Sequence, residues 1–184
     1  MKKSIYLWQL IGFLIASLGG TLLHFLYDML SKSVWIAPFS GVNESTWEHM
    51  KLLFFPMFIY AIVQSFFFKE RKDFWCVKLR GILVGLALIP ILFYTYNGVI
   101  AKSPDFVNIA IFFISAAIAY AYETRLFNSG KVKCNSQGRA FLILLVIGAL
   151  FVIFTFRTPE INIFKDPITN SYGILAKLNS IGMP

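Results

Sequence analysis

Long apolar stretches alternate with short polar ones along this chain of 184 residues. An apolar stretch of about 20 residues is long enough to cross the hydrocarbon core of a bilayer as a helix. None of the stretches shows the strict two-residue alternation that a membrane β-strand requires. The pattern therefore predicts an all-α membrane protein, a single polytopic bundle of five transmembrane helices. The predicted spans are residues 5–27, 45–68, 80–98, 105–123 and 139–156, followed by a segment outside the bundle at 157–184.

The composition supports this class of protein. Hydrophobic residues make up 58% of the chain and charged residues only 14%, and phenylalanine alone occurs 20 times. Soluble domains are about 45–50% apolar and about 25% charged, and a soluble fold of this size has too little interior to bury so much apolar surface. High hydrophobicity also excludes a disordered chain.

The formal net charge of +8 has three readings: nucleic-acid binding, attraction to an anionic membrane surface, or membrane topology. The N-terminus and residues 69–80 and 123–139 would share one side, with eleven basic and three acidic residues. The other side carries six of each. The positive-inside rule then places the N-terminus in the cytoplasm and the C-terminal segment outside. The charge is thus explained by topology, and we expect no nucleic-acid partner.

The two cysteines, Cys76 and Cys134, both fall on the basic side. Thiols in the cytoplasm are kept reduced, and neither cysteine has the spacing of a redox or metal motif. We therefore expect two reduced cysteines that act only as unreactive packing residues.

Small residues recur at intervals of three to four along the first span, at Gly12, Ala16, Gly19 and Gly20. Such spacing lets the backbones of two membrane helices approach closely. The first span should therefore pack tightly against its neighbours.

The chemistry-bearing residues gather in the hairpin between the first two spans. His24 and Asp28 lie four residues apart on the last turn of the first span, so they share a face. Both histidines of the chain, His24 and His49, lie in this hairpin. Ser45 and Glu48 have the spacing of a capping box, which explains these two residues structurally. Ionisable groups at a membrane boundary otherwise indicate a functional site.

Two histidines with one or two carboxylates are typical of a zinc, iron or manganese site. We expect His24, Asp28 and His49 to bind a divalent metal such as zinc, and either Glu44 or Glu48 to act as general base. Glu44 and Glu48 would share a helix face, which is unfavourable unless a cation lies between them. A metal-free hydrogen-bonded network and a proton or ion path remain alternatives. No other cofactor is indicated.

The C-terminal segment is too polar to span a membrane, and its proline and glycine spacing predicts turns. It could cover the hairpin as a lid, with Arg157 or Lys165 pairing with Glu44 or Glu48 or holding an anionic substrate group. Alternatively, it lies on the membrane interface. The predicted substrate and lid residues are Ser45, Lys51, Arg157, Lys165, Asp166 and Tyr172.

Three motifs carry a family resemblance: H-x-x-Y-D at residues 24–28, V-N-E-S-x-W-E-H-x-K-L at 42–52, and F-x-D-P-x-x-x-x-Y-G-I at 164–174. The chain resembles a family of small bacterial integral membrane proteins that is defined only as a domain of unknown function. The resemblance implies a multi-pass protein of the bacterial cytoplasmic membrane and brings no activity with it.

The Ser45-x-x-x-His49 pair, together with Asp28, is also similar to the zinc-binding pattern of alkaline ceramidases and progestin-receptor-like membrane hydrolases. Those proteins have seven spans and a later His-x-x-x-His pair. This chain has five predicted spans and no histidine after His49, so the second half of that pattern is missing.

Two functional hypotheses follow. The first is a metal-dependent intramembrane enzyme acting on a lipid or lipid-linked substrate. The second is a non-enzymatic carrier of an ion, a proton or a small solute, or a membrane assembly protein, using the same pocket. The expected partners are the bilayer and a lipid-like or small-molecule ligand, and the sequence gives no oligomeric state.

Overall fold

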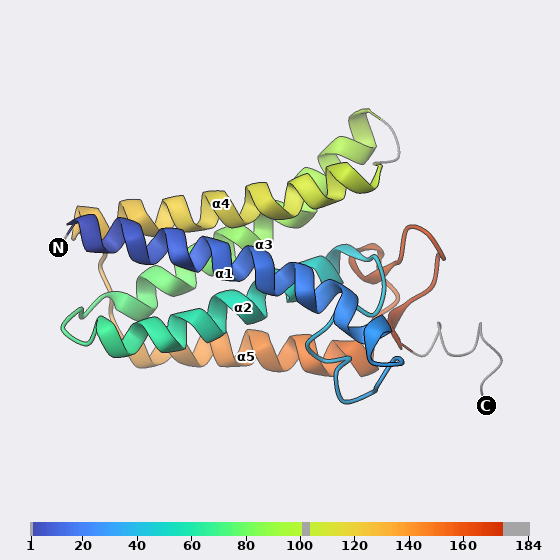
Figure 1. Ribbon diagram of the computed structural model, residues 1–184, viewed down its shortest axis with the longest axis horizontal. Helices are drawn as coiled ribbons and strands as arrows, with labels where there is room; N and C mark the ends of the chain where they lie inside the picture. The colour runs from blue at the N-terminus through green and yellow to red at the C-terminus, as the bar shows by residue number, and fades with distance from the viewer. Residues whose placement is uncertain (1, 101–103, 175–184) are drawn as a thin grey trace.

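The computed structural model describes residues 2–100 and 104–174 (Figure 1). Each of its five long helices is long and apolar enough to cross a membrane, which confirms the predicted fold class. A short 3₁₀ helix and one isolated bridge, between Lys165 and Tyr172, lie in the C-terminal segment. The helices are α1 (Lys2–Met29), α2 (Thr46–Phe67), α3 (Phe74–Val99), α4 (Asp105–Ser129), α5 (Gln137–Phe156) and η1 (Asn162–Phe164).

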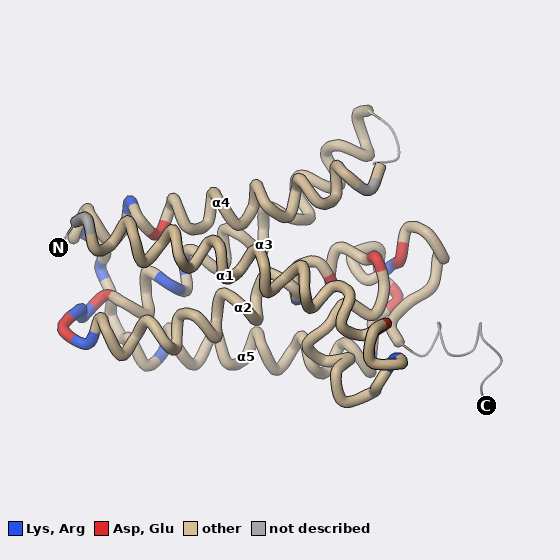
Figure 2. Tube along the Cα trace, in the orientation of Figure 1, with Lys and Arg blue, Asp and Glu red and all other residues tan. Residues whose placement is uncertain are grey.

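The two ends of the bundle differ in charge (Figure 2). The end that holds the N-terminus and the α2–α3 and α4–α5 connections carries most of the lysines and arginines, and we call it the basic end. The α1–α2 connection and the C-terminal segment lie together at the opposite end, which we call the hairpin end. The charge separation expected from the sequence is therefore present in the fold. Lys102 and Lys177, counted in that expectation, lie outside the described residues.

Helix ends follow local sequence signals. The Ser45 hydroxyl accepts a hydrogen bond from the Glu48 amide and caps α2, and the Ser136 hydroxyl caps α5 in the same way through the Arg139 amide. Gly130 ends α4 with φ of +60°, a left-handed conformation that a residue without a side chain adopts at little cost.

α2 lies at the centre of the bundle and packs against the other four helices, while α1 packs on α4 and α3 on both α4 and α5. The tight packing predicted for the first span is present. A Cβ atom added to Gly12 would lie 2.5 Å from the Tyr60 ring and 2.6 Å from the Tyr120 ring, and one added to Gly19 would lie 3.1 Å from Pro56. Close approach at these glycines brings α1 against both α2 and α4.

Large apolar side chains are exposed on the outer surface of the bundle. Examples are Leu18 of α1, Phe66 of α2 and Leu142 of α5. A contiguous apolar surface of this kind is costly in water and suits a bilayer. The outside of the bundle therefore fits a lipid environment.

The helices extend further toward the basic end than the sequence indicated. α3 begins at Phe74 and α4 continues to Ser129. Lys78 and Glu123, which we had counted as loop charges, thus lie inside helices, where both are fully buried and form an ion pair of 2.6 Å. Lys78 also lies 5.3 Å from the centre of the Tyr120 ring, which adds a cation–π contact.

The expectation of two reduced cysteines is wrong. Cys76, in the first turn of α3, forms a disulfide with Cys134 of the α4–α5 connection. The error came from treating the two residues separately by compartment, whereas the fold brings their Cα atoms to 5.7 Å, within the range that a disulfide bridges.

Candidate metal centre

The α1–α2 connection folds back onto the last turns of α1. The Ser40 hydroxyl donates to the Leu23 carbonyl and accepts from the Tyr27 amide at 2.9 Å. The Gly41 amide donates to the Leu23 carbonyl at 3.2 Å. These bonds use main-chain groups at the end of α1, so they hold the start of α2 close to His24.

A buried ion pair fixes the start of α2. The fully buried Lys51 ammonium lies 2.6 Å from the Glu48 carboxylate and donates to the Ala37 carbonyl and to the Thr155 hydroxyl, at 2.9 Å and 3.1 Å. Glu48 also accepts from the Val42 amide at 3.0 Å. This network joins the α1–α2 connection, α2 and α5, and it gives Glu48 and Lys51 a clear structural role.

The capping box forms in one direction only. The Ser45 hydroxyl accepts from the Glu48 amide, but the Glu48 carboxylate bonds the Val42 amide instead of the Ser45 amide, which donates to Asn43 Oδ1. Because α2 begins at Thr46, Glu44 precedes the helix, and the predicted shared face with Glu48 does not exist. Glu44 is turned toward the two histidines instead.

Three side chains converge at the hairpin end: His24 from α1, Glu44 from the connection and His49 from α2. One Glu44 oxygen lies 3.6 Å from His24 Nε2 and the other lies 3.7 Å from His49 Nε2. One potential ligand atom from each residue lies within 4.8 Å of the others. All three side chains are partly exposed, so the centre is open to a ligand.

A main-chain bond orients His49. Its Nδ1 lies 3.0 Å from the Ser45 carbonyl oxygen, which can accept a hydrogen bond but cannot donate one. This contact favours the tautomer with the proton on Nδ1 and leaves the Nε2 lone pair facing Glu44. Metal-binding histidines are commonly oriented by such a second contact.

The donor set and its spacing suit zinc. Two imidazoles and one carboxylate are a common set of protein ligands in catalytic zinc sites, where the fourth position is left for water or substrate. Tetrahedral zinc with bonds of about 2.0–2.1 Å separates neighbouring ligand atoms by roughly 3.3 Å. The histidine nitrogens lie 3.6 and 3.7 Å from different Glu44 oxygens, and one ligand atom from each of the three residues lies within 4.8 Å of the others. Small side-chain rotations would therefore complete the coordination.

A cavity of about 410 Å³ opens beside the three residues. It lies between α1 and α4, and Ile168 of the C-terminal segment contributes to its wall. Apart from the candidate ligands, its polar lining comes from Thr21 and Asn108. The remaining lining residues are Gly20, Phe25, Leu52, Ile109, Phe112, Phe113 and Ile168.

The structure places the other predicted site residues as follows. Asp28 lies one turn beyond His24 on α1 and outside the convergent trio, so the carboxylate beside the histidines is that of Glu44. Among the described residues, Arg157 and Lys165 form no ion pair with Glu44 or Glu48. The catalytic and metal-binding roles assigned from the sequence stay predictions.

The C-terminal segment does pack against the hairpin. The Thr46 hydroxyl donates to the Ile163 carbonyl at 3.0 Å, and the Trp47 and Phe164 rings lie 4.5 Å apart. Asp166 accepts from the amides of Ile168 and Thr169 and so fixes the turn that carries Ile168 to the cavity. This arrangement is consistent with the lid interpretation. The part of the segment from residue 175 onward lies outside the described residues.

Sequence reasoning missed the role of three groups. Thr21 and Asn108 line the cavity but carry no motif, and Asn108 lies on a helix far away in sequence. The Lys78–Glu123 pair joins residues 45 positions apart, so only a contact map would reveal it. Glu44 was noticed, but its role depends on where α2 begins.

The fold and this trio define the class: an all-α, multi-pass membrane protein with a candidate metal centre at one end of the bundle. Within that class, the chain belongs to a family of unknown function (DUF6512), whose model matches residues 1–174. The matched range includes the positions of the three motifs at residues 24–28, 42–52 and 164–174. No curated protein and no solved structure matches the chain significantly.

Proposed function

We propose that this protein binds a divalent metal, with zinc preferred, through His24, Glu44 and His49, and that it acts on an amphiphilic, lipid-like substrate. The observation that carries the proposal is the position of the Glu44 carboxylate, with one oxygen facing each histidine at 3.6 and 3.7 Å beside an open cavity. When bound, zinc would supply a Lewis acid and an activated water.

The cavity supports the choice of substrate. Its wall is mostly apolar, and its volume of about 410 Å³ lies in the range of small-molecule sites. Thr21 and Asn108 offer polar atoms on the α1 and α4 sides. An amphiphile would place its apolar part between these helices and its polar group at the trio.

The same arrangement leaves neither Glu44 nor Glu48 in the role of general base. Glu48 is paired with Lys51 and buried, and Glu44 lies between the histidines. In this proposal Glu44 is therefore a metal ligand, and the Lys51–Glu48 pair positions the start of α2.

The charge asymmetry supports an orientation with the basic end in the cytoplasm and the hairpin end outside. The family resemblance supports a bacterial cytoplasmic membrane. In this orientation the metal centre would take its metal and its substrate from the outer side.

The first test measures metal in protein purified in detergent without chelator. We expect stoichiometric zinc, iron or manganese by elemental analysis in the unsubstituted chain, and loss of it in His24→Ala, His49→Ala and Glu44→Gln. Glu160→Gln removes an exposed carboxylate of the C-terminal segment, outside the trio, and serves as the control. Unchanged elution and helicity would show that the variants fold. Metal-free protein that also fails to take up added zinc would overturn the proposal.

The second test fills the cavity. Thr21 is exposed and lines it, so Thr21→Trp should block entry with little damage to the fold. Leu22→Trp, at the next exposed position of α1, leaves the cavity open. With a photoactivatable fatty acid as probe, we expect adducts on cavity residues of α1 and α4 that Thr21→Trp abolishes and Leu22→Trp preserves. Equal labelling of both variants would contradict the assignment of the cavity.

The buried Lys78–Glu123 pair supports the second candidate, a carrier. Ionisable groups inside a membrane segment often belong to ion or proton pathways. In addition, among the residues that the structure describes, the Gln64 amide and the Tyr120 hydroxyl are buried without a hydrogen-bond partner. Proteoliposomes containing the protein and a pH-sensitive dye distinguish the two functions. A carrier would show proton flux that Glu123→Gln abolishes, whereas a metal-dependent enzyme would show none.

A further inference from the structure

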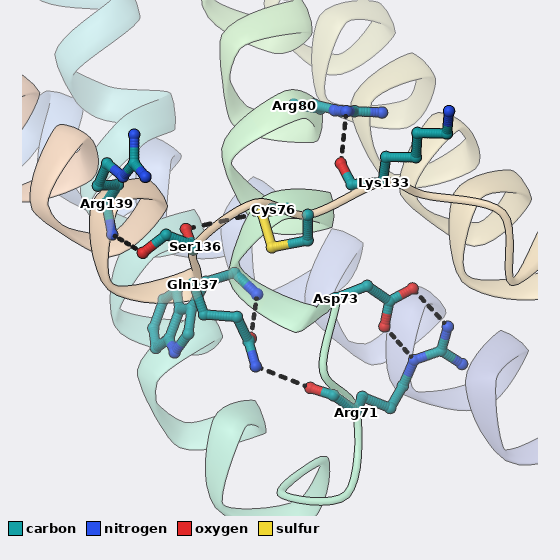
Figure 3. The surroundings of a disulfide bond; sticks show 10 residues. Arg71, Asp73, Cys76, Arg80, Lys133, Ser136, Gln137 and Arg139 are labelled. Atoms are coloured by element: carbon teal, nitrogen blue, oxygen red, sulfur yellow. Dashed lines mark hydrogen bonds and ion pairs between the residues drawn. A yellow bond between two sulfur atoms is a disulfide. The ribbon is translucent and has the colours of Figure 1, made fainter.

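The disulfide at the basic end joins the first turn of α3 to the α4–α5 connection, and hydrogen bonds also hold this region together (Figure 3). The Gln137 side chain accepts from the Trp75 amide at 3.1 Å and donates to the Arg71 carbonyl at 3.2 Å. The Arg80 guanidinium donates to the Lys133 carbonyl at 3.2 Å. These contacts need no sulfur–sulfur bond, so Cys76 and Cys134 would stay adjacent when reduced and could be oxidised again.

The bond is accessible. Both cysteines are partly exposed, and Cys134 lines an open depression of about 410 Å³ between the α2–α3 and α4–α5 connections. The depression is polar on one side, where Glu70, Lys72 and Asp73 lie. An attacking thiolate can therefore reach the Cys134 sulfur from the aqueous side.

The role of an accessible disulfide depends on the cellular compartment that it faces. In the orientation proposed above, the basic end faces the cytoplasm. Disulfides there are rare, and those that occur are usually transient and serve catalysis or redox sensing. A buried structural disulfide in an oxidising compartment would need neither the open depression nor the hydrogen bonds that hold the connections together.

We propose that Cys76 and Cys134 form a reversible thiol–disulfide exchange site that reacts with an external dithiol in the cytoplasm. This inference rests on the orientation given under the proposed function and is independent of the metal. Reduction would remove the covalent link between the start of α3 and the α4–α5 connection, and this would loosen residues 130–136.

The chemistry balances as a two-electron exchange. One thiolate of the dithiol attacks Sγ of Cys134, which forms a mixed disulfide and releases the Cys76 thiolate. The second thiol of the reagent then attacks the reagent sulfur that is bonded to Cys134, and the Cys134 thiolate is released. The dithiol leaves as a disulfide, and its two electrons and two protons end on the two cysteines. Oxidation follows the reverse sequence.

The test uses the full chain, whose only two cysteines make the thiol count unambiguous. Growing cells are quenched in acid, and free thiols are counted by the gel shift of a mass-tagged maleimide. We expect two tags in unstressed cells, none after a thiol oxidant, and two again after the oxidant is removed. Cys76→Ser and Cys134→Ser should each carry one tag under all three conditions.

A bond that stays oxidised in unstressed cells and resists added thioredoxin-type dithiol in inverted vesicles would be structural and would overturn the proposal. Two tags that persist under oxidant would overturn it as well. Exchange that responds to glutathione but not to a dithiol would replace the proposed partner with a monothiol.

Labelling from one side of the membrane tests the proposed orientation separately from the metal proposal. A membrane-impermeant maleimide, applied after reduction, should label inverted vesicles and leave intact spheroplasts unlabelled. Labelling of spheroplasts would show the basic end to be outside and would refute the cytoplasmic site. Failure of the metal proposal alone would appear only in the metal content, which the doubly substituted Cys76→Ser/Cys134→Ser chain should retain because the centre lies at the other end of the bundle.

Discussion

At the residue scale, the candidate metal centre depends on which carboxylate faces the two histidines. Asp28 and Glu44 are both close to His24 in sequence or space, but only Glu44 lies in the trio with His24 and His49.

We therefore predict different effects for two isosteric substitutions. Asp28→Asn should keep the bound metal, whereas Glu44→Gln should lose it, because an amide binds zinc far more weakly than a carboxylate. Elemental analysis of the two purified variants, with the unsubstituted chain alongside, measures the difference. Metal loss in Asp28→Asn with retention in Glu44→Gln would restore the donor set read from the sequence.

The buried ion pair of Lys78 and Glu123 gives a second prediction at this scale. Lys78→Met leaves the Glu123 carboxylate buried without its partner, which should lower the free energy of unfolding by about 3–5 kcal/mol. The doubly substituted chain, Lys78→Met with Glu123→Leu, buries no charge and should recover most of that loss. Denaturant unfolding in detergent compares the two. A double variant as unstable as the single one would show that the pair itself stabilises the bundle.

Much of the site could be predicted from single residues. The gathering of both histidines in one hairpin was visible in the sequence, and the Ser45 cap was visible as a capping box, which is a local signal. Glu44 took an unexpected role because the helix begins two residues after it. The buried position of Lys51 beside Glu48 also depends on hydrogen bonds to the Ala37 carbonyl and the Thr155 hydroxyl, which are remote in sequence.

At the scale of the element, the packing of α1 depends on its glycines, which carry no side chain. Gly12 lies against the Tyr60 and Tyr120 rings, and Tyr60 is itself held by a 2.6 Å hydrogen bond to the Trp8 carbonyl. Because the Tyr60 hydroxyl is bonded to the main chain of α1 itself, one turn before Gly12, its ring has little freedom to move away from a new methyl group.

Gly12→Ala should consequently destabilise the protein by about 1–3 kcal/mol, the usual cost of overpacking. Gly98→Ala is the matched control, since an added Cβ there meets nothing within 4 Å. A better helix former at Gly98 should leave the stability unchanged or raise it by up to about 1 kcal/mol. Thermal unfolding in detergent measures both, and equal midpoints would contradict the close approach of α1 to α2 and α4.

The existence of the five helices followed from hydrophobic run length, which is a property of each segment alone. Their ends were harder to predict at the basic end. The Lys78–Glu123 pair allows α3 and α4 to continue past the point where a lone charge would end an apolar run. Gly81 contributes to this, since a Cβ at that position would collide with the Glu123 side chain.

At the scale of the whole molecule, the charge difference between the two ends predicts how the bundle sits in a membrane. A reporter that is active only in the cytoplasm should work when fused to the N-terminus, and one active only outside should work after Pro184. Neutralising Lys69, Arg71 and Lys72 in the α2–α3 connection should weaken this preference, because loop lysines and arginines set orientation. Substituting Lys32 and Lys165 at the hairpin end should leave it unchanged.

The disulfide could not be predicted from the sequence, and the reason is a property of the whole molecule. Cys76 and Cys134 are 58 residues apart, and they meet because α3 and α4 are antiparallel neighbours whose basic ends coincide. Compartment rules predict whether a bond persists and say nothing about which side chains are adjacent.

The origin of the trio in one short stretch of chain has a consequence for biogenesis. All candidate ligands come from the segment between His24 and His49, which the first two helices bracket. The donor set is therefore complete as soon as the α1–α2 pair has entered the membrane, before α3, α4 and α5 have joined it. In that case metal can join two newly inserted helices into a template on which the later helices assemble.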